Sequence, residues 1–340
     1  MTQPDTRPRS VSPARRIASR RRDAVEARIA EFSRIPRVQA GSLLLSVFGD
    51  LLLPRGGRVW LGSLIQLLTP LGVNDRMMRT AIFRLAQENW LVAEAHGRRA
   101  DYSLTESGAQ RIRDASRRIY AAQSPAWDQR WRFIFLVNEL DLQTREALRR
   151  SLFWQGFGNL GPNCFVHPTT DLDRVFQALS AEGLASACLA LLPVRAADAA
   201  VGQSASPHDL VMQAWNLERL ADRYSAFVAS YEPIAEALMR GGNTDLSPQN
   251  ALLVRLLLIH DYRRLLLRDP DLPAELLPPA WPGEAARALC RALYRLLLAP
   301  SEDHIDTMLV TANDEPLPRA GPTLVQRFQG PDPLSDEPLR

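Results

Sequence analysis

An arginine-bearing stretch at 74–90 is the first feature of this sequence that could bind another molecule. It reads NDRMMRTAIFRLAQENW, and at about 100° per residue its apolar side chains fall on one face of a helix. The opposite side carries a second set, namely Arg76, Arg79, Thr80, Phe83 and Gln87, with Arg84 at its flank. Such a face is either an ordinary solvated surface or a row of guanidinium groups that binds an acidic partner.

A second pair of arginines lies at a turn between two alternating segments. LVAEA at 91–95 and ADYSL at 100–104 have the period of two that is typical of β-strands, and the turn between them contains Arg98 and Arg99. Three short helical segments precede this hairpin, so the order predicts a winged helix-turn-helix DNA-binding domain. In such a domain Arg76, Arg79, Thr80 and Arg84 reach the base edges. Arg98 and Arg99 reach the phosphate backbone.

The charge distribution also favours a nucleic-acid partner for the N-terminal part. Residues 1–118 hold 21 arginines against 11 acidic residues, a net charge of +10, whereas residues 119–340 hold 20 against 27, a net charge of −7. All 41 basic residues are arginine, whose planar fork suits phosphates and base edges. The basic part of the chain therefore needs an acidic partner, and the rest does not.

Motifs for catalysis, metals and cofactors are weak in this sequence. The stretch GFGNLG at 156–161 has the spacing of a dinucleotide-binding loop, but a helix precedes it and a strand follows it. That order is reversed, so we interpret it as a helix C-cap and a turn. The five histidines and three cysteines show no ligand spacing. We expect no catalytic residues, no metal and no cofactor.

The periodicity predicts a multidomain α+β protein. Its predicted parts are a basic, partly disordered arm (1–37), the winged helix-turn-helix domain (38–124), a ferredoxin-like central α/β domain (125–195), a C-terminal helical domain (196–310) and a proline-rich disordered tail (311–340). No apolar run reaches the roughly 18 residues that span a bilayer, and the N-terminus lacks an apolar signal segment. We therefore expect a cytoplasmic protein with no membrane partner.

Three blocks of sequence resemble one known family. The block GDLLLPRGGRVWLGSLIQLLTPLGVNDRMMRTAIFRLAQENWLVAEAHGRRADYSLTESG is similar to the N-terminal domain of PaaX-type repressors of phenylacetic acid catabolism. The resemblance continues through WDQRWRFIFL and FWQGFGNLGPNCFVHP, and it returns at LLIHDYRRLLLRDPDLPAELLPPAWPGEAARALCRALY. It covers roughly residues 40–305, and the ordered combination of all three blocks is more specific than the first block alone.

The resemblance implies a dimeric transcriptional repressor that binds an inverted-repeat operator in double-stranded DNA. It also implies release from the operator by an acyl-CoA effector, with phenylacetyl-CoA as the expected inducer, and it makes the block 74–85 the recognition helix. An acyl-CoA site needs an apolar lining and arginines for the phosphates. The C-terminal region offers such side chains, which are Trp215, Tyr224, His260, Tyr262, Arg263 and Arg264.

Two other classes of function stay open on the sequence. A metal-dependent nuclease or a CoA-using enzyme could carry the basic domain as a targeting module. For a nuclease the candidate acids near the first strand of the central domain are Asp128, Glu139 and Asp141. The third class is an architectural DNA-binding protein that no effector releases.

Overall fold

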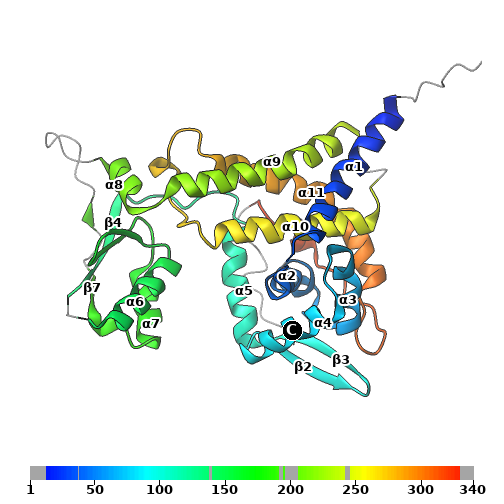
Figure 1. The fold of residues 1–340 in the computed structure, drawn as a ribbon, viewed down its shortest axis with the longest axis horizontal. Coiled ribbons are helices and arrows are strands. Elements are labelled where there is room, and N and C mark those ends of the chain that lie inside the picture. The colour runs from blue at the N-terminus through cyan, green and yellow to red at the C-terminus, as the bar shows by residue number, and fades with distance from the viewer. Residues whose placement is uncertain are drawn as a thin grey trace, which may run out of the picture. The chain divides into compact units, whose positions relative to one another are not determined.

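The structure is a computed structural model of a mixed α+β chain in which helices predominate (Figure 1). The residues that it describes are 13–36, 38–137, 140–190, 194–195, 206–241 and 246–329. Packing divides the chain into two compact units. Unit 1 is Met1–Arg117, Val228–Asp261 and Arg287–Arg340, and unit 2 is Arg118–Phe227 and Tyr262–Ala286.

The N-terminal part of unit 1 alternates short helices with a small sheet. Its elements are α1 (Pro13–Ser33), α2 (Ala40–Val47), a π-helical turn (Phe48–Leu52), a 3-10 turn (Leu53–Arg55), β1 (Arg58–Trp60), α3 (Leu61–Leu68), a 3-10 turn (Thr69–Leu71), α4 (Asp75–Gln87), β2 (Leu91–His96), β3 (Arg99–Leu104) and α5 (Glu106–Ile119). The helices and the hairpin predicted from the sequence are confirmed here. The hairpin of β2 and β3 projects beyond α4 (Figure 1).

Local sequence explains where α4 and α5 begin. The side chain of Asn74 accepts a hydrogen bond from the backbone N–H of Met77 at 2.9 Å, which satisfies one of the free donors at a helix start. Thr105 does the same for α5, since its Oγ1 accepts from the backbone N–H of Gly108 at 2.9 Å. Both are residue types that are strongly preferred at helix N-caps.

The small sheet has a third strand that the alternating pattern did not reveal. Its order is β1-β3-β2, and all the pairings are antiparallel. Strand β1 has only three residues, and Val59 in its middle pairs with Tyr102. A segment this short gives no readable period of two, so only the tertiary pairing identifies it as a strand.

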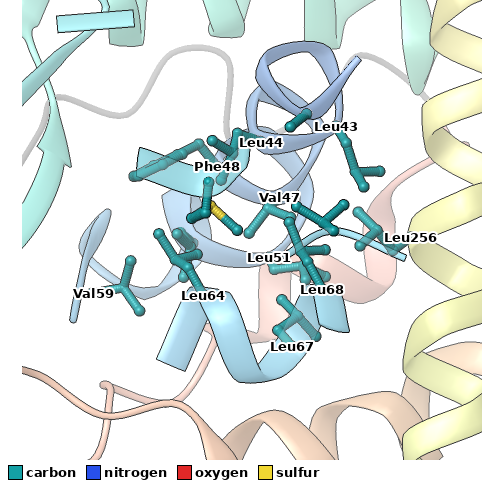
Figure 2. Packing of buried hydrophobic residues seen from close by; sticks show 14 of the residues in the cluster. Leu43, Leu44, Val47, Phe48, Leu51, Val59, Leu64, Leu67, Leu68 and Leu256 are labelled. Carbon is teal, nitrogen blue, oxygen red and sulfur yellow. The ribbon is translucent and has the colours of Figure 1, made fainter. Parts of the chain in front are cut away.

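The core of unit 1 joins N-terminal and C-terminal segments. Leu43, Val47, Leu51 and Leu68 form its centre, and Leu256 from the later helix α10 packs among them (Figure 2). Other members come from α10 and from α11, namely Leu252, Leu253, Leu257 and Ile305. The N-terminal elements therefore do not close their core alone, and packing crosses the segment boundaries that the sequence predicted.

Charged side chains are also buried in unit 1. Asp50, in the π-helical turn, is fully buried and pairs with two buried arginines: Arg255 Nε lies 2.9 Å and Arg327 Nη1 lies 2.8 Å from its carboxylate oxygens. Tyr294 donates its hydroxyl hydrogen to Asp50 at 3.0 Å. Burial lowers the pKa of Arg255, but Asp50 and its other partners outweigh burial and raise that pKa above its usual value. Arg255 therefore keeps its positive charge inside the fold.

Unit 2 contains an antiparallel sheet with two helices. Its first elements are β4 (Arg130–Leu136), α6 (Leu142–Trp154), β5 (Gly158–Gly161), β6 (Cys164–His167), α7 (Leu172–Ala181), a 3-10 turn (Ala185–Ala187), β7 (Cys188–Ala190) and β8 (Val194–Arg195). The strand order is β5-β6-β4-β7, and β8 pairs with β4. The two helices α6 and α7 share a core with the sheet.

The stretch GFGNLG is only partly the cap and turn that the sequence predicted. Gly156 has a φ of +87° directly after the C-cap residue of α6, as expected of a left-handed helix end. The next residues are not a turn, however, because Gly158–Gly161 pair with β6 as strand β5. Gly158 is also required by packing, since an added Cβ would lie 2.6 Å from the ring of Trp215.

Four helices follow in the C-terminal part of the chain. They are α8 (Pro207–Ala214), α9 (Leu217–Gly241), α10 (Pro248–Leu266) and α11 (Pro282–Met308), with 3-10 turns at Ala274–Leu276 and Pro322–Gln326. The long helices α9, α10 and α11 each contribute residues to both compact units. In the described part of the chain, no helix is both long and apolar enough to cross a membrane.

The prediction of a disordered tail is wrong for residues 311–329. Here Val310 and Pro316 form a β-bridge, and Leu317, Leu324 and Phe328 are buried. We call residues 309–329 the C-terminal strap. Its prolines suggested disorder. Its few apolar side chains and Arg327 nevertheless pack against residues of unit 1 that are distant in sequence, as Leu317 does in the core and Arg327 does with Asp50. The predicted disorder of 330–340 and of the first residues of the arm lies outside the described residues.

Candidate nucleic-acid interface

Helix α4 presents an exposed polar face and buries the opposite one. Met78, Ala81, Ile82 and Leu85 are the buried residues of this helix. The outward residues are all exposed, and they are Arg76, Arg79, Thr80, Phe83, Arg84 and Gln87. The helical wheel therefore assigned both faces correctly. Phe83 keeps 65% of its surface exposed, which adds an apolar contact point to a row of arginines.

One arginine of this row is held in place by its own helix. Arg79 Nε donates to Asp75 Oδ2 at 2.8 Å across one helical turn, and both side chains are more than half exposed. The hydrogen bond with Asp75 raises the pKa of Arg79. An exposed pair of this kind contributes little stability. Its consequence is orientation, because the Nη atoms remain available to a ligand while Nε is occupied.

An open groove of about 720 Å³ runs along α4. One wall is formed by Arg76, Thr80 and Arg84 of α4, and the other by the start of α2, including Gln39 and Ser42. Arg76 and Arg84 lie two helical turns apart, which is about 12 Å along the axis. The groove therefore offers two guanidinium groups and several neutral hydrogen-bonding side chains to an elongated anionic partner.

The turn between β2 and β3 carries two arginines in different environments. Arg98 is exposed. Arg99 is partly covered: its guanidinium lies 4.5 Å from the ring centroid of Trp60, and its Nη1 donates to Asp314 at 2.5 Å. Arg98 is thus the more accessible of the two for a phosphate, whereas Arg99 is already paired within unit 1.

The C-terminal strap fixes this side of the hairpin. Ala312 donates its backbone N–H to Asp101 at 2.6 Å, and the backbone N–H of Trp60 donates to Val310 at 3.0 Å. Sequence reasoning missed Trp60 and Asp314 as partners of Arg99. No short-range signal could have identified them, since Asp314 is more than 200 residues away from Arg99 in the chain.

The aromatic side chains predicted to bind an effector are used in packing. Trp215 donates its Nε1–H to Gly156 at 3.0 Å. Tyr224 is buried, donates its hydroxyl hydrogen to Asp269 and packs against Trp281. Tyr262 is buried against Phe227, with ring centroids 5.6 Å apart. These three residues, all in unit 2, have structural partners, and their role toward an effector stays a prediction.

The other effector candidates fall in different environments. His260, in unit 1, is buried, and its Nδ1 lies 3.1 Å from Ser46 Oγ. Arg263 is mostly covered, so burial, together with the neighbouring positive charge of Arg264, lowers its pKa to about 10. Arg264 itself is exposed. Of the six candidates, Arg264 is therefore the one whose charged end is exposed to solvent.

The acidic residues considered for a nuclease site have structural partners. Asp128 accepts from Arg132 Nη1 at 2.8 Å and from Nη2 at 2.7 Å, and these bonds lower the pKa of Asp128. Asp141 caps α6 by accepting from the backbone N–H of Thr144 at 2.9 Å. Glu139 lies outside the described residues. Among the residues described, no group of three or more His, Cys, Asp and Glu could hold a metal ion.

Comparison with known proteins identifies relatives along most of the chain. Family models match in chain order: "PaaX-like protein" at residues 39–108, "PaaX protein central Cas2-like domain" at 124–204 and "PaaX-like protein C-terminal domain" at 215–307. The transcriptional repressor PaaX of Escherichia coli K12 is 38% identical over 296 residues, which are 86% of this chain and 91% of that protein. Among solved structures, the uncharacterized protein Rv0674 of Mycobacterium tuberculosis covers 70% of this chain and 88% of its own, with 25% identity and a TM-score of 0.45.

Proposed function

Because this chain belongs to the family of PaaX-type transcriptional repressors, we propose that it represses genes of phenylacetic acid catabolism by binding duplex DNA. The observation that carries this proposal is the row of Arg76, Arg79 and Arg84 on the exposed face of α4. In this proposal α4 is the recognition helix of a winged helix-turn-helix domain, and the β2–β3 hairpin is its wing. The protein acts in the cytoplasm.

The arginines of α4 and of the hairpin have different tasks in this function. Arginine forks on α4, with Thr80, contact base edges in the major groove, where each good bidentate pair discriminates by about 1–3 kcal/mol. Arg98 and Arg99 contact the phosphate backbone, which adds affinity without sequence information. In a homodimer, two copies of α4 enter successive major grooves of an inverted repeat, whose half-sites lie about 34 Å apart.

The elements from β4 to β7 in unit 2 follow each other along the chain as β-α-β-β-α-β, and their strands lie in the sheet in the order β5-β6-β4-β7. Both orders are those of a ferredoxin-like domain. We assign it a structural or dimerising role rather than a catalytic one, because Asp128 and Asp141 are engaged by Arg132 and Thr144. Incubation of the protein with Mg²⁺ and labelled duplex tests this assignment, and strand scission would support a nuclease instead.

The DNA-binding role is tested by the variant Arg79→Ala. Binding to the operator and to random duplex is measured side by side. The variant Arg150→Ala, at an exposed position on α6, is the control for the lost charge. We expect Arg79→Ala to weaken operator binding about 5- to 150-fold, the equivalent of 1–3 kcal/mol, and to affect random DNA much less. An equal loss of affinity for both duplexes would show that Arg79 does not recognise bases.

Release by an effector is the second part of the proposal. Phenylacetyl-CoA is expected to dissociate the protein–operator complex by binding preferentially to the arrangement that does not bind DNA. The measurement is a titration of that complex with a panel of acyl-CoA thioesters up to high micromolar concentration. If the complex persists with phenylacetyl-CoA but dissociates with another thioester, that thioester is the inducer. A complex that survives the whole panel would contradict induction by this ligand class.

A further inference from the structure

Four arginines of unit 2 lie close together at the start of α9 and the end of α10. Arg219 and Arg223 are one turn apart on α9, and Arg264 and Arg268 have the same spacing at the end of α10. We call these four residues the arginine cluster. Arg219, Arg264 and Arg268 are exposed, and Arg223 is partly exposed. None of them belongs to the core of unit 2.

Contacts between the two helices explain why the four side chains meet. The rings of Phe227 and Tyr262 lie 5.6 Å apart, and Tyr224 bonds to Asp269. The contact residue with the lower number on α9 therefore pairs with the higher number on the α10 side, which means that the two segments run antiparallel. One turn before Phe227 comes Arg223, which is therefore opposite the stretch between Arg264 and Arg268. The two pairs of arginines thus lie side by side across the helix–helix contact.

In the part of the chain that the structure describes, no arginine of the cluster forms an ion pair. None of the four guanidinium groups lies within 4.0 Å of a carboxylate there. Burial and then the charges of Arg268, Arg219 and Arg264 lower the pKa of Arg223, so the other three arginines lie close enough to act on its charge. Other exposed arginines of the molecule, such as Arg79 and Arg174, form ion pairs with acidic side chains on or next to their own helix.

We propose that the arginine cluster binds the phosphates of a coenzyme A thioester. This inference rests on the effector proposed above and assigns its anionic end to a site. One helical turn is about 6 Å long, and packed helices lie about 8–10 Å apart. The cluster therefore presents charge over an area too wide for a single carboxylate. A ligand with a diphosphate and a separate 3′-phosphate supplies several anionic groups over such a distance, and arginine forks bind phosphates bidentately.

The charge of unit 2 favours a small ligand over DNA at this place. Its sequence segments hold 13 arginines against 15 acidic residues, a net charge of −2. A long polyanion lies along an extended surface and experiences the charges within a Debye length, about 8 Å, of its whole path, whereas a compact ligand experiences mainly the groups it touches. A local positive cluster on a weakly acidic unit therefore suits a small organic phosphate.

The test measures ligand binding to the whole 340-residue chain in the absence of DNA. Isothermal titration calorimetry with phenylacetyl-CoA, coenzyme A and adenosine 3′,5′-bisphosphate is performed on wild type and on the double variant Arg223→Gln/Arg268→Gln. The matched control is Arg150→Gln/Arg174→Gln, which removes the same charge from exposed positions on α6 and α7 of unit 2. Circular dichroism confirms that each variant is folded.

We expect the cluster variant to bind all three ligands at least about 10-fold more weakly, since each lost charge-assisted hydrogen bond is strong, and the control to match wild type. Equal affinity of the cluster variant and wild type, or no binding of coenzyme A to wild type, would overturn the proposal. Loss of operator affinity with unchanged coenzyme A affinity would overturn it as well, because the cluster would then bind the DNA backbone. Operator binding is measured in a separate experiment. If the protein binds coenzyme A through the cluster but binds no operator, the repressor function is refuted while the cluster proposal stands.

Discussion

Two groups of arginines in unit 1 have the same chemistry and opposite surroundings. Arg76, Arg79 and Arg84 stand on the exposed face of α4. Arg255 and Arg327, by contrast, are fully buried around Asp50. A buried guanidinium is committed to its internal partners, because leaving it unpaired is costly. An exposed one contributes little to stability and is free to bind a ligand. Burial therefore separates the arginines that are committed to internal partners from those that we propose bind DNA.

The largest expected effect concerns the buried group. Asp50→Asn removes the charge that pairs with both Arg255 and Arg327, so it is expected to lower the free energy of unfolding by about 3–5 kcal/mol. Chemical denaturation measures this change. The matched substitution on the exposed helix, Asp75→Asn, is expected to change stability by less than about 1 kcal/mol. Similar losses for the two variants would contradict the comparison.

A buried histidine in unit 2 gives a related effect that depends on pH. Burial lowers the pKa of His167 to about 3, and its Nδ1 accepts hydrogen bonds from the backbone N–H groups of Thr169 and Thr170 at 3.1 and 2.9 Å. The unfolded chain binds a proton at this residue below pH about 6.5, while the folded chain does not until about pH 3. Stability contributed by His167 is therefore present above pH about 6.5 and is lost as the pH falls below it.

The expected slope is about 1.4 kcal/mol per pH unit below that point. Chemical denaturation of wild type and of His167→Gln between pH 7 and 5 gives the free energy of unfolding of each at each pH. The difference between the two slopes is the contribution of His167, since the variant lacks the titrating group. If both proteins lose stability equally over this range, His167 is not the group responsible.

A smaller effect is expected for Arg98, the exposed arginine in the turn between β2 and β3. Arg98→Ala is expected to weaken binding to all DNA sequences alike and to reduce the slope of log affinity against log salt by about one. Electrophoretic mobility shifts at several salt concentrations measure that slope on operator and random duplex. A loss confined to the operator would instead assign Arg98 to base recognition.

The smallest effect is expected for the acidic partner of Arg99. Asp314→Asn removes a negative charge that occupies Arg99 Nη1 while the stacking of Arg99 on Trp60 remains. DNA binding should therefore tighten by a few-fold, in keeping with roughly 1 kcal/mol for unit charges at close range in water. Weaker binding in Asp314→Asn would mean that Asp314 orients Arg99 for DNA more than it competes with it.

Local signals in the sequence were sufficient for most elements of the fold. The alternation in 91–104 identified the hairpin. Side chains at the starts of α4, α5 and α6, namely Asn74, Thr105 and Asp141, accept hydrogen bonds from backbone N–H groups only a few residues away. These signals act between residues a few positions apart. Strand β1 and the strand in GFGNLG were missed because their definition lies in a distant partner strand.

The same limit applies to the candidate sites. The wheel placed every outward residue of α4 on the exposed face, because one amphipathic helix contains that information. The aromatic residues chosen for the effector site turned out to be packed side chains. Nothing in the sequence indicated that Arg219, Arg223 and Arg268 lie near Arg264, since the antiparallel contact of α9 with α10 brings them together.

The sequence by itself determined the helices, their caps, the hairpin and the polar face of α4, because these features depend on the spacing of neighbouring residues. Only the tertiary structure decided that Asp50 is enclosed by Arg255 and Arg327, and that the strap pairs Asp314 with Arg99. The physical reason is that the energy of an ion or an apolar side chain depends on what surrounds it, and those surroundings come from segments far away in the chain.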